Sequence, residues 1–452
     1  MVEQVCTKQT SCFEGRLFAP VQPDSEQEPD NPFMTMMIGK KNNWHRPRLA
    51  ASPFFSPNRL KNIVPMIDDK VKGVMELLDL EEQKNQPFDV REPMQQYAMD
   101  VLCQVAFGID LALLDPSKPN HVEGMKIFKE AREMVHNGVV QSPWIFRLIS
   151  TLPEIQPLAK LLIHFVMKFS TGPLSPLHGL LELITSTVEQ RKSGQVKKND
   201  LLQLLYQATN FDADSENNKD AKFLNEGQLK TNTVMFLMSG YETTSTTLAY
   251  LSHTLAMHQE AQEKLYQEIS MVYPDQSTEL DFDTVMNKMP YLDAVVMETI
   301  RIYPEGINII NRFITQETTL RGYEIPKSLG SILVDVWSIH QDPELWGPVD
   351  PSQFHPERFL PDYQTSNRPR SAYLGFGIGP HHCIGMRYAL LEIKMTIIRM
   401  LQRYRIEPES PDAPKRIPVK VELVMVPTGE VNLKLTRRPV AHGTEIEEKM
   451  TF

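Results

Sequence analysis

A glycine-rich segment in the last quarter of the chain carries a single cysteine directly before an apolar helix pattern. Residues 376–385 read FGIGPHHCIG, and the following pattern predicts a helix over Met386–Tyr404. Unpaired backbone N–H groups and the helix dipole favour a thiolate at Cys383, where this helix begins. The glycines let the backbone adopt positive φ and approach a flat partner closely. Cys383 is therefore a candidate thiolate ligand; the alternative is a structural cysteine in a glycine-rich loop.

A second candidate lies within the helix predicted over Lys230–Ala256, where residues 239–244 read SGYETT. Glycine and adjacent hydroxyl residues are poor helix formers, so this segment conflicts with the helix that contains it. Such conflicts are expected where a functional site perturbs a helix. The alternative is an ordinary threonine-rich helix face.

Several charged residues have spacings that suit ion pairs or carboxylate binding. Glu298 and Arg301 lie one helical turn apart on the same face. Arg48 follows Trp44 by four residues, and Arg312 follows Asn311. Guanidinium groups bind carboxylates through paired N–H donors. Taken singly, each of these residues would more often be a solvated surface residue.

Composition bounds the class of protein. The chain has 452 residues, of which 41% are hydrophobic and 23% charged, enough apolar material for a large core. A net charge of −10 gives no reason to expect nucleic acid as a partner. The four cysteines form no CxxC pair and fit a reducing compartment. No run reaches the ~18 apolar residues that suggest a membrane-spanning helix.

Helix-period patterns dominate as far as about residue 310, and short β-rich runs follow. Polar loops are expected over Lys192–Asp200 and Asn210–Gln228, and an irregular proline-rich stretch over Asp342–Pro369. Val419–Val426 and Val431–Leu435 flank Pro427-Thr428-Gly429, which predicts a β-hairpin. The helices are expected over Val64–Leu80, Met94–Phe107, Leu201–Thr209, Lys230–Ala256 and Ala261–Val272, and the strands within Arg312–Ile325 and Gly330–Val336.

These segments together resemble the cytochrome P-450 family. Its haem-binding pattern F-x-x-G-x-x-x-C-x-G is matched by Phe376, Gly379, Cys383 and Gly385. Four further patterns follow the family's order: W-x-x-x-R at residues 44–48, A/G-G-x-D/E-T-T/S at 239–244, E-x-x-R at 298–301 and P-E-R-F at 356–359. The closest texture is that of microsomal, drug-metabolising members. The resemblance implies a mainly α fold with small β-sheets, forming one haem-thiolate monooxygenase domain over residues 1–452.

The resemblance also implies roles for the site residues. Cys383 would be the axial ligand of haem b iron, within a loop that includes Phe376, Gly379, His381 and Gly385. Trp44, Arg48 and Arg312 would contact the haem propionates. Most members have arginine where this chain has His381, and a neutral imidazole neutralises less propionate charge.

Two further sets of residues take roles from the resemblance. Thr243 would hydrogen-bond the oxygen ligand, and Glu242 would relay protons. Glu298, Arg301 and Arg358 would form a buried network that supports the cysteine loop. A pocket with a soft methionine lining would draw on residues 17–37, 145–169, 236–243, 306–310 and 427–430.

Partners and location follow from the family. A small apolar substrate would be oxidised with electrons from NADPH, delivered by a reductase. The reductase would dock near Cys383, on a basic surface formed by Arg387, Lys394, Arg399 and Arg403; the alternative there is a solvated helix face. Full-length members lie on the cytosolic face of the endoplasmic reticulum membrane.

The family also has an anchor helix and leading sheet strands before the W-x-x-x-R helix, whereas few residues precede Trp44 here. This chain is therefore expected to be N-terminally incomplete, without the anchor and first strands, and any membrane contact would be peripheral. Two other functions compete with the monooxygenase: a haem-thiolate isomerase or lyase acting on peroxides, and a non-functional truncated product. Retention of Glu242 and Thr243 favours the monooxygenase, because peroxide rearrangement needs no proton relay to dioxygen.

Overall fold

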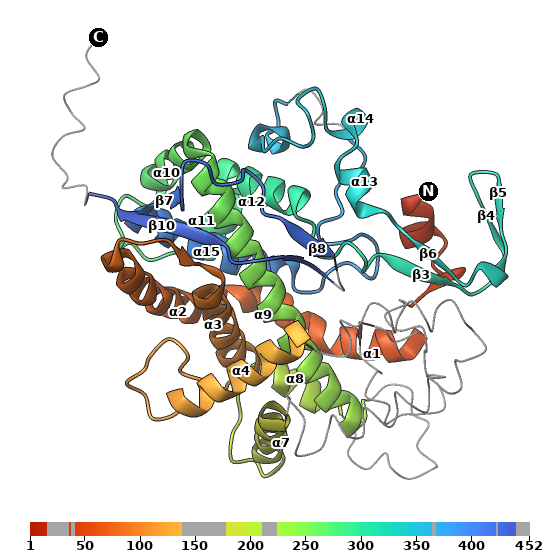
Figure 1. Cartoon of the computed structure of the whole chain (residues 1–452). Coiled ribbons are helices and arrows are strands. Elements are labelled where there is room, and N and C mark those ends of the chain that lie inside the picture. The colour runs from red at the N-terminus through yellow and green to blue at the C-terminus, as the bar shows by residue number, and fades with distance from the viewer. Residues whose placement is uncertain are drawn as a thin grey trace.

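The computed structural model describes residues 1–15, 36–37, 41–137, 178–209, 224–363, 368–421 and 424–439. Within these ranges helices form the body and small sheets lie at its two sides, as Figure 1 shows, which confirms the expected mainly α fold with small β-sheets. The longer helices are α1 (Lys41–Ala51), α2 (Pro57–Lys84), α3 (Arg91–Leu102), α4 (His121–Asn137), α7 (His178–Lys192), α8 (Leu201–Gln207), α9 (Glu226–Met257), α10 (Gln259–Val272), α12 (Pro290–Ile302) and α15 (Met386–Arg403).

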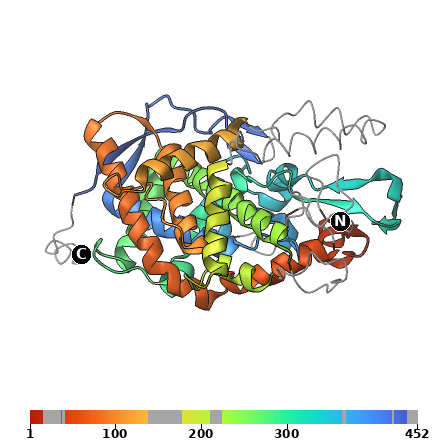
Figure 2. The ribbon, with the colours of Figure 1, turned by 90° about the horizontal axis from the view of Figure 1, so that it is seen from below.

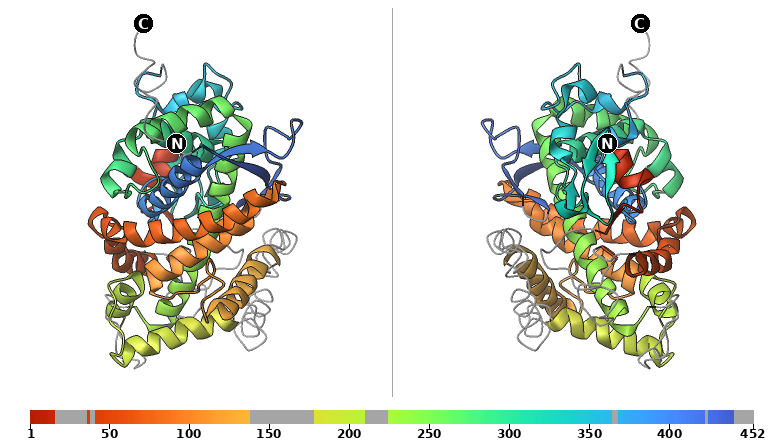
Figure 3. Two further views of the ribbon diagram at one scale, coloured as in Figure 1. Left: turned by 90° about the vertical axis from the view of Figure 1, so that its left-hand side faces the viewer. Right: turned by 90° about the vertical axis from the view of Figure 1, so that its right-hand side faces the viewer.

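The shorter helices and the strands come mainly from the second half of the chain. The helices are α11 (Phe282–Asn287), α13 (Val336–His340) and α14 (Pro343–Trp346). The strands are β1 (Phe13–Glu14), β2 (Phe88–Asp89), β3 (Asn311–Ile314), β4 (Thr318–Leu320), β5 (Tyr323–Ile325), β6 (Ser331–Leu333), β7 (Tyr404–Pro408), β8 (Val419–Val421), β9 (Met425–Pro427) and β10 (Asn432–Arg437). Figure 3 shows α7 at the opposite end of the body from α13 and α14.

The central helix α9 organises the core. Asn225 and Gln228 form a reciprocal capping box, which fixes the first turn of the helix. From Tyr241 to Ala256 every residue except Thr243 is buried, and α3 packs alongside. The loop predicted over Asn210–Gln228 is therefore too long at its end, and the cap pattern N-x-x-Q marks the true helix start. Residues 210–223 lie outside the described part of the chain.

Two three-stranded antiparallel sheets flank the helical body. One has the order β1-β3-β6, with Phe13 opposite Ile314 and Asn311 opposite Leu333. Figure 2 places this sheet, the β4–β5 hairpin and the N-terminal segment at one end of the molecule. The other sheet has the order β2-β10-β7.

The hairpin predicted around Pro427-Thr428-Gly429 is wrong. The chain reverses earlier, because β8 pairs with β9 in a register that places Val421 opposite Met425. The next strand, β10, instead pairs with β7 and β2. Burial explains this choice: Leu433 and Leu435 enter the main core beside Ile406 of β7.

Two smaller corrections concern helix boundaries. The helix predicted over Met386–Tyr404 ends at Arg403, because Tyr404 already belongs to β7. The proline-rich stretch after Asp342 is not wholly irregular, since it contains α14 and a 3-10 turn over Pro356–Phe359. Among the described residues no helix combines the length and apolarity needed to cross a bilayer.

Candidate active site

The cysteine loop has the geometry that its sequence predicts. Cys383 is exposed two residues before Gly385, the N-cap of α15. Its backbone N–H donates to the Phe376 carbonyl over 2.8 Å, and the His382 N–H donates to the Gly379 carbonyl over 3.0 Å. These bonds close the loop and hold the sulfur at the positive end of a long helix. Such a position favours the thiolate form that a soft metal centre requires.

Two glycines in the loop are required for different reasons. Gly377 has φ +72° and Gly379 has φ +77°, a region that L side chains rarely adopt. A Cβ at Gly379 would also lie 2.0 Å from the carbonyl oxygen of Cys6. The N-terminal segment therefore packs directly on the loop, and Gly379 makes that approach possible.

Helix α1 brings an aromatic ring and a guanidinium group to the same loop. The Trp44 and His381 rings lie 4.0 Å apart between centroids, with an interplanar angle of 30°. Arg48 Nη2 lies 3.4 Å from His382 Nδ1, and that nitrogen also lies 2.8 Å from the Gly379 carbonyl. The shorter contact makes Nδ1 a donor, so it cannot also accept from Arg48. Trp44 and Arg48 thus lie against the histidines of the cysteine loop, and their contact with a haem propionate stays a prediction.

The two arginines have different electrostatic surroundings. Arg48 interacts with the charge of Cys383, whereas Arg312 is buried. Burial lowers the pKa of Arg48, while the charge of Cys383 acts in the opposite direction. Arg312 on β3 is 2% exposed, and burial lowers its pKa too. Its Nη1 donates to the Asn311 carbonyl over 2.7 Å, and no carboxylate within the described ranges forms an ion pair with it. A buried cation of this kind fits an external carboxylate such as a haem propionate.

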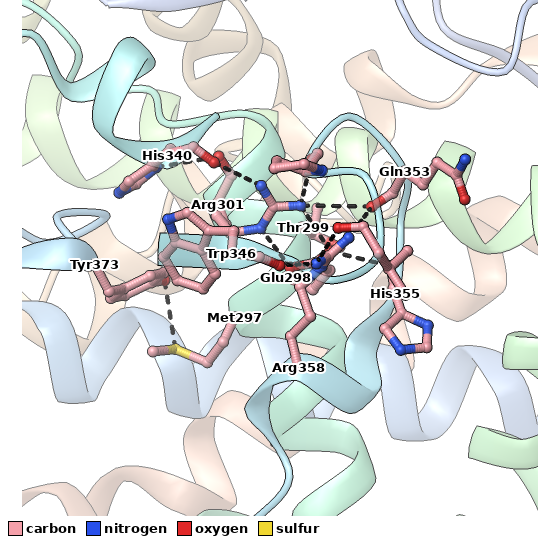
Figure 4. Close-up of polar contacts among 12 residues, drawn as sticks. Met297, Glu298, Thr299, Arg301, His340, Trp346, Gln353, His355, Arg358 and Tyr373 are labelled. Atoms are coloured by element: carbon pink, nitrogen blue, oxygen red, sulfur yellow. Dashed lines mark hydrogen bonds and ion pairs between the residues drawn. The ribbon is translucent and has the colours of Figure 1, made fainter. Parts of the chain in front are cut away.

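A buried charge network joins α12 to the segment that contains Arg358 (Figure 4). Glu298 Oε2 accepts from Arg301 Nε over 2.6 Å, and Oε1 accepts from Arg301 Nη2 over 2.7 Å and from Arg358 Nε over 3.2 Å. All three side chains are fully buried. The remaining guanidinium N–H groups reach backbone carbonyls of His340, Trp346, Val349, Asp350 and Pro351. The predicted network is therefore present and includes chain segments that sequence spacing does not reveal.

The hydroxyl and acid of α9 point to different surroundings. Thr243 is partly exposed, and its Oγ1 donates to the Ser239 carbonyl over 2.7 Å. Glu242 is buried, and its Oε2 accepts from Gln95 Nε2 on α3 over 3.3 Å. Burial raises the pKa of Glu242, which favours its protonated form.

The helix does not break at residues 239–244, although the sequence there conflicts with a helix. It runs unbroken from Glu226 to Met257. A Cβ at Gly240 would lie 2.6 Å from Leu102 Cδ2, so the glycine leaves room for this side chain of α3.

Comparison with known proteins identifies the family. The family model described as Cytochrome P450 matches residues 1–435. This chain belongs to the cytochrome P450 family. It is 29% identical to Cytochrome P450 3A41 of Mus musculus over 89% of this chain and 75% of the relative. It is 31% identical to Cytochrome P450 3A29 of Sus scrofa over 82% of this chain and 70% of the relative. Lithocholate 6-beta-hydroxylase of Mesocricetus auratus is 29% identical over 89% of this chain and 76% of that protein.

Family membership carries the general activity. The chain is a haem-thiolate monooxygenase, with a cysteine thiolate on the haem iron and electrons supplied by a reductase. Its substrates are apolar organic molecules. The iron and its thiolate supply the oxygen chemistry, while the P450 polypeptide supplies binding, orientation and protons.

The basic docking surface expected on α15 is largely wrong. Lys394 is 1% exposed and pairs with Asp293, and Arg399 is 5% exposed and pairs with Asp68. Arg403 binds Asp79 and is only partly exposed. These cations tie α15 to neighbouring elements because the helix runs through the core, and Arg387 alone of the four is exposed.

The expected pocket segments are only partly described. Residues 145–169, and all of 17–37 except Met36 and Met37, lie outside the described ranges. The Met36 backbone N–H donates to Asn232 Oδ1 on α9 over 2.8 Å, so this segment reaches the central helix. Residues 306–309 are partly exposed and follow the buried residues 301–305, as expected of a segment that lines a pocket.

Proposed function

We propose that Cys383 is the thiolate ligand of the haem iron in this monooxygenase, within one domain that includes the whole chain. The observation that carries the proposal is the exposed sulfur on a hydrogen-bonded loop at the start of α15. Cys103 is a poor alternative, because burial raises the pKa of its thiol above the normal range. Phe376, Gly379 and Gly385 shape the loop that faces the macrocycle.

The haem carboxylates would be held by groups from three elements. Arg48 from α1 and the buried Arg312 from β3 supply guanidinium donors, and the Trp44 ring lies between Arg48 and His381 in contact with both. Arg312 in particular has a buried charge that a propionate would neutralise. His381 adds a titratable ring at a place where the family usually has a permanent cation.

Proton handling is assigned to α9. When bound, the haem group activates dioxygen, and the chain must deliver protons to it while excluding bulk water. Glu242 is a buried acid whose raised pKa keeps a proton available. Thr243 offers a hydroxyl on the partly exposed part of the same helix, which can hold the oxygen ligand or a water.

Partners and location follow the same proposal. Electrons come from an NADPH-dependent reductase on the Cys383 side of the molecule, where Arg387 and His382 are exposed. The substrate is a small apolar molecule that undergoes insertion of one oxygen atom, and nucleic acid plays no part. The chain works on the cytosolic face of the endoplasmic reticulum membrane.

The test is the ferrous carbon-monoxide spectrum of the purified, haem-loaded chain. A thiolate ligand gives a strongly red-shifted Soret band. We expect this band in the unsubstituted chain and in Cys12→Ala, and its loss in Cys383→Ala. Survival of the red-shifted band in Cys383→Ala would overturn the assignment.

A further inference from the structure

Gln95 on α3 is a buried polar residue that has no part in the thiolate site or in the Glu298 network. It is 3% exposed, and Glu242, its partner on α9, is 5% exposed. Gln95 Nε2 donates a hydrogen bond to Glu242 Oε2 over 3.3 Å. Each group depends on the other, because a buried polar group that lacks a partner is costly. The contact therefore acts on the acid to which proton handling is assigned.

The packing of α3 against α9 fixes where this pair lies. Gln95 and Leu102 are seven residues apart, so they share one face of α3. Leu102 meets α9 at Gly240, and Gln95 meets the same helix at Glu242. Successive residues of a helix point about 100° apart, so Thr243 does not share the direction of Glu242. The hydrogen bond thus holds the carboxyl on the α3 side of α9, one residue before the hydroxyl assigned to the oxygen ligand.

The charge of Glu242 is influenced by several neighbours. Burial raises its pKa, and the hydrogen bond from Gln95 is the strongest influence in the opposite direction. The other titratable groups that interact with Glu242 are Arg91, Arg132, Tyr241, Tyr250 and Glu305. Both arginines are already paired with other carboxylates, over 2.8 Å and 3.3 Å. The uncharged amide is therefore the neighbour best placed to act on this carboxyl.

A primary amide can pair with either protonation state of a carboxyl. Its N–H groups donate to a carboxylate, and its oxygen accepts from a carboxylic acid after a half-turn of the amide. Gln95 Oε1 is buried and has no hydrogen-bond partner among the described residues, so this acceptor is spare. An aliphatic side chain at the same place would leave both states of Glu242 without this partner.

We propose that Gln95 is a positioning residue for proton delivery, which keeps the Glu242 carboxyl in place while it loses and regains a proton. The carboxyl releases its proton toward the Thr243 side of α9 and takes up another from solvent. The amide donates to the ionised form and accepts from the protonated form. The inference rests on the proposed function and adds a residue that acts through Glu242, not on the substrate or the haem.

Infrared pH titration of the haem-loaded chain tests the hydrogen bond directly. The carbonyl stretch of protonated Glu242 is the band that Glu242→Gln removes. Gln95→Met keeps the length of the side chain but cannot pair with the carboxyl, so this band should move to higher frequency. The midpoint of its titration should rise by about one pH unit, because a donor that favours the ionised form is lost.

A neighbour on the same helix provides the matched control. Gln96 is partly exposed, and its Nε2 donates to the exposed Glu92 over 3.4 Å. Gln96→Met should leave the Glu242 band and its midpoint unchanged. An unchanged band and midpoint in Gln95→Met would overturn the proposal.

Turnover distinguishes positioning from general packing. With NADPH, a reductase and a fluorogenic alkoxycoumarin as probe, Gln95→Met should form product roughly 10-fold more slowly. In a Glu242→Gln background the same change should have no further effect, since Gln95 acts through that acid. An equal loss of rate in both backgrounds, or faster product formation in Gln95→Met, would contradict the proposal.

The same samples separate this inference from the proposed function. If the band moves in Gln95→Met while Glu242→Gln forms product as fast as wild type, the proton relay fails and the hydrogen bond stands. The carbon-monoxide spectrum of each sample reports independently on the Cys383 ligand, and we expect it to be unchanged in Gln95→Met.

Discussion

His340 Nε2 accepts a hydrogen bond from the backbone N–H of Leu374 over 2.8 Å. On the other side of the ring, Nδ1 lies 3.1 Å from the Arg301 carbonyl. Because Nε2 accepts, Nδ1 carries the proton and donates. One neutral imidazole therefore joins the buried Glu298–Arg301 pair to the chain that leads into the cysteine loop. Through this link the network can fix the position of Phe376 and Cys383.

The first prediction concerns acid stability. Burial lowers the pKa of His340 to about 4 from its ordinary value of 6.5. Its contribution is therefore present above pH 6.5 and is lost as the pH falls toward 4. Between pH 7.5 and pH 5 the loss in the free energy of unfolding should be about 2 kcal/mol. His340→Gln, which can still accept and donate, should lack this part of the pH dependence in urea unfolding. Exposed His45→Gln serves as control, and equal pH dependence in wild type and His340→Gln would contradict the prediction.

The second prediction concerns the charge at the centre of the network. Glu298→Ala leaves the guanidinium groups of Arg301 and Arg358 buried without a counter-charge. Breaking a buried pair in this way costs roughly 3–5 kcal/mol. We expect less folded chain and lower haem content, measured by thermal unfolding and by absorbance.

A surface acid of the same segment provides the control for this change. Glu357 is partly exposed and pairs with the exposed Lys264 over 2.7 Å. Exposed pairs contribute up to about 1 kcal/mol, so Glu357→Gln should change little. Equal thermal stability of Glu298→Ala and Glu357→Gln would show that the buried network is not essential to the fold.

Short motifs could be recognised from the sequence, whereas contacts between distant segments could not. The cysteine loop, the α1 residues and the Glu298–Arg301 pair each lie within one loop or one helix, and the resemblance to the family gave them their expected roles. His340 escaped notice because its partner Leu374 is 34 residues away and only the fold brings them together. Long-range pairing also determines the sheet that β10 joins. Its alternation of apolar and polar residues suited the predicted hairpin equally well, but β10 pairs with β7 and β2. The sequence predicts Lys394 and Arg399 as surface cations because it cannot show which aspartates the fold places beside them.

The third prediction concerns a buried acid on α15. Glu392 is 1% exposed beside Tyr388, and burial raises its pKa from 4.5 to about 8. An acid whose pKa is raised by folding stabilises most at low pH, and this contribution is lost as the pH rises through that range. Between pH 5.5 and pH 8 the wild-type chain should lose about 3 kcal/mol that Glu392→Gln does not lose. Chemical denaturation at the two pH values measures this. Exposed Glu279→Gln should keep the wild-type pH dependence, and a Glu392→Gln profile parallel to wild type would refute the prediction.

The last prediction separates oxygen chemistry from haem binding. Thr243 Oγ1 donates to the Ser239 carbonyl, which leaves its lone pairs to accept a hydrogen bond from a water. Thr243→Val removes the hydroxyl at nearly constant volume, so haem loading and the carbon-monoxide spectrum should be kept. General acid–base assistance is worth about 10²–10⁴-fold in rate, so product formation should fall. NADPH consumption should continue, with its electrons ending in hydrogen peroxide. The ratio of peroxide to product, compared with that of the buried neighbour variant Thr244→Val, is the quantity to measure. A ratio that does not rise in Thr243→Val would mean that this hydroxyl serves only the helix.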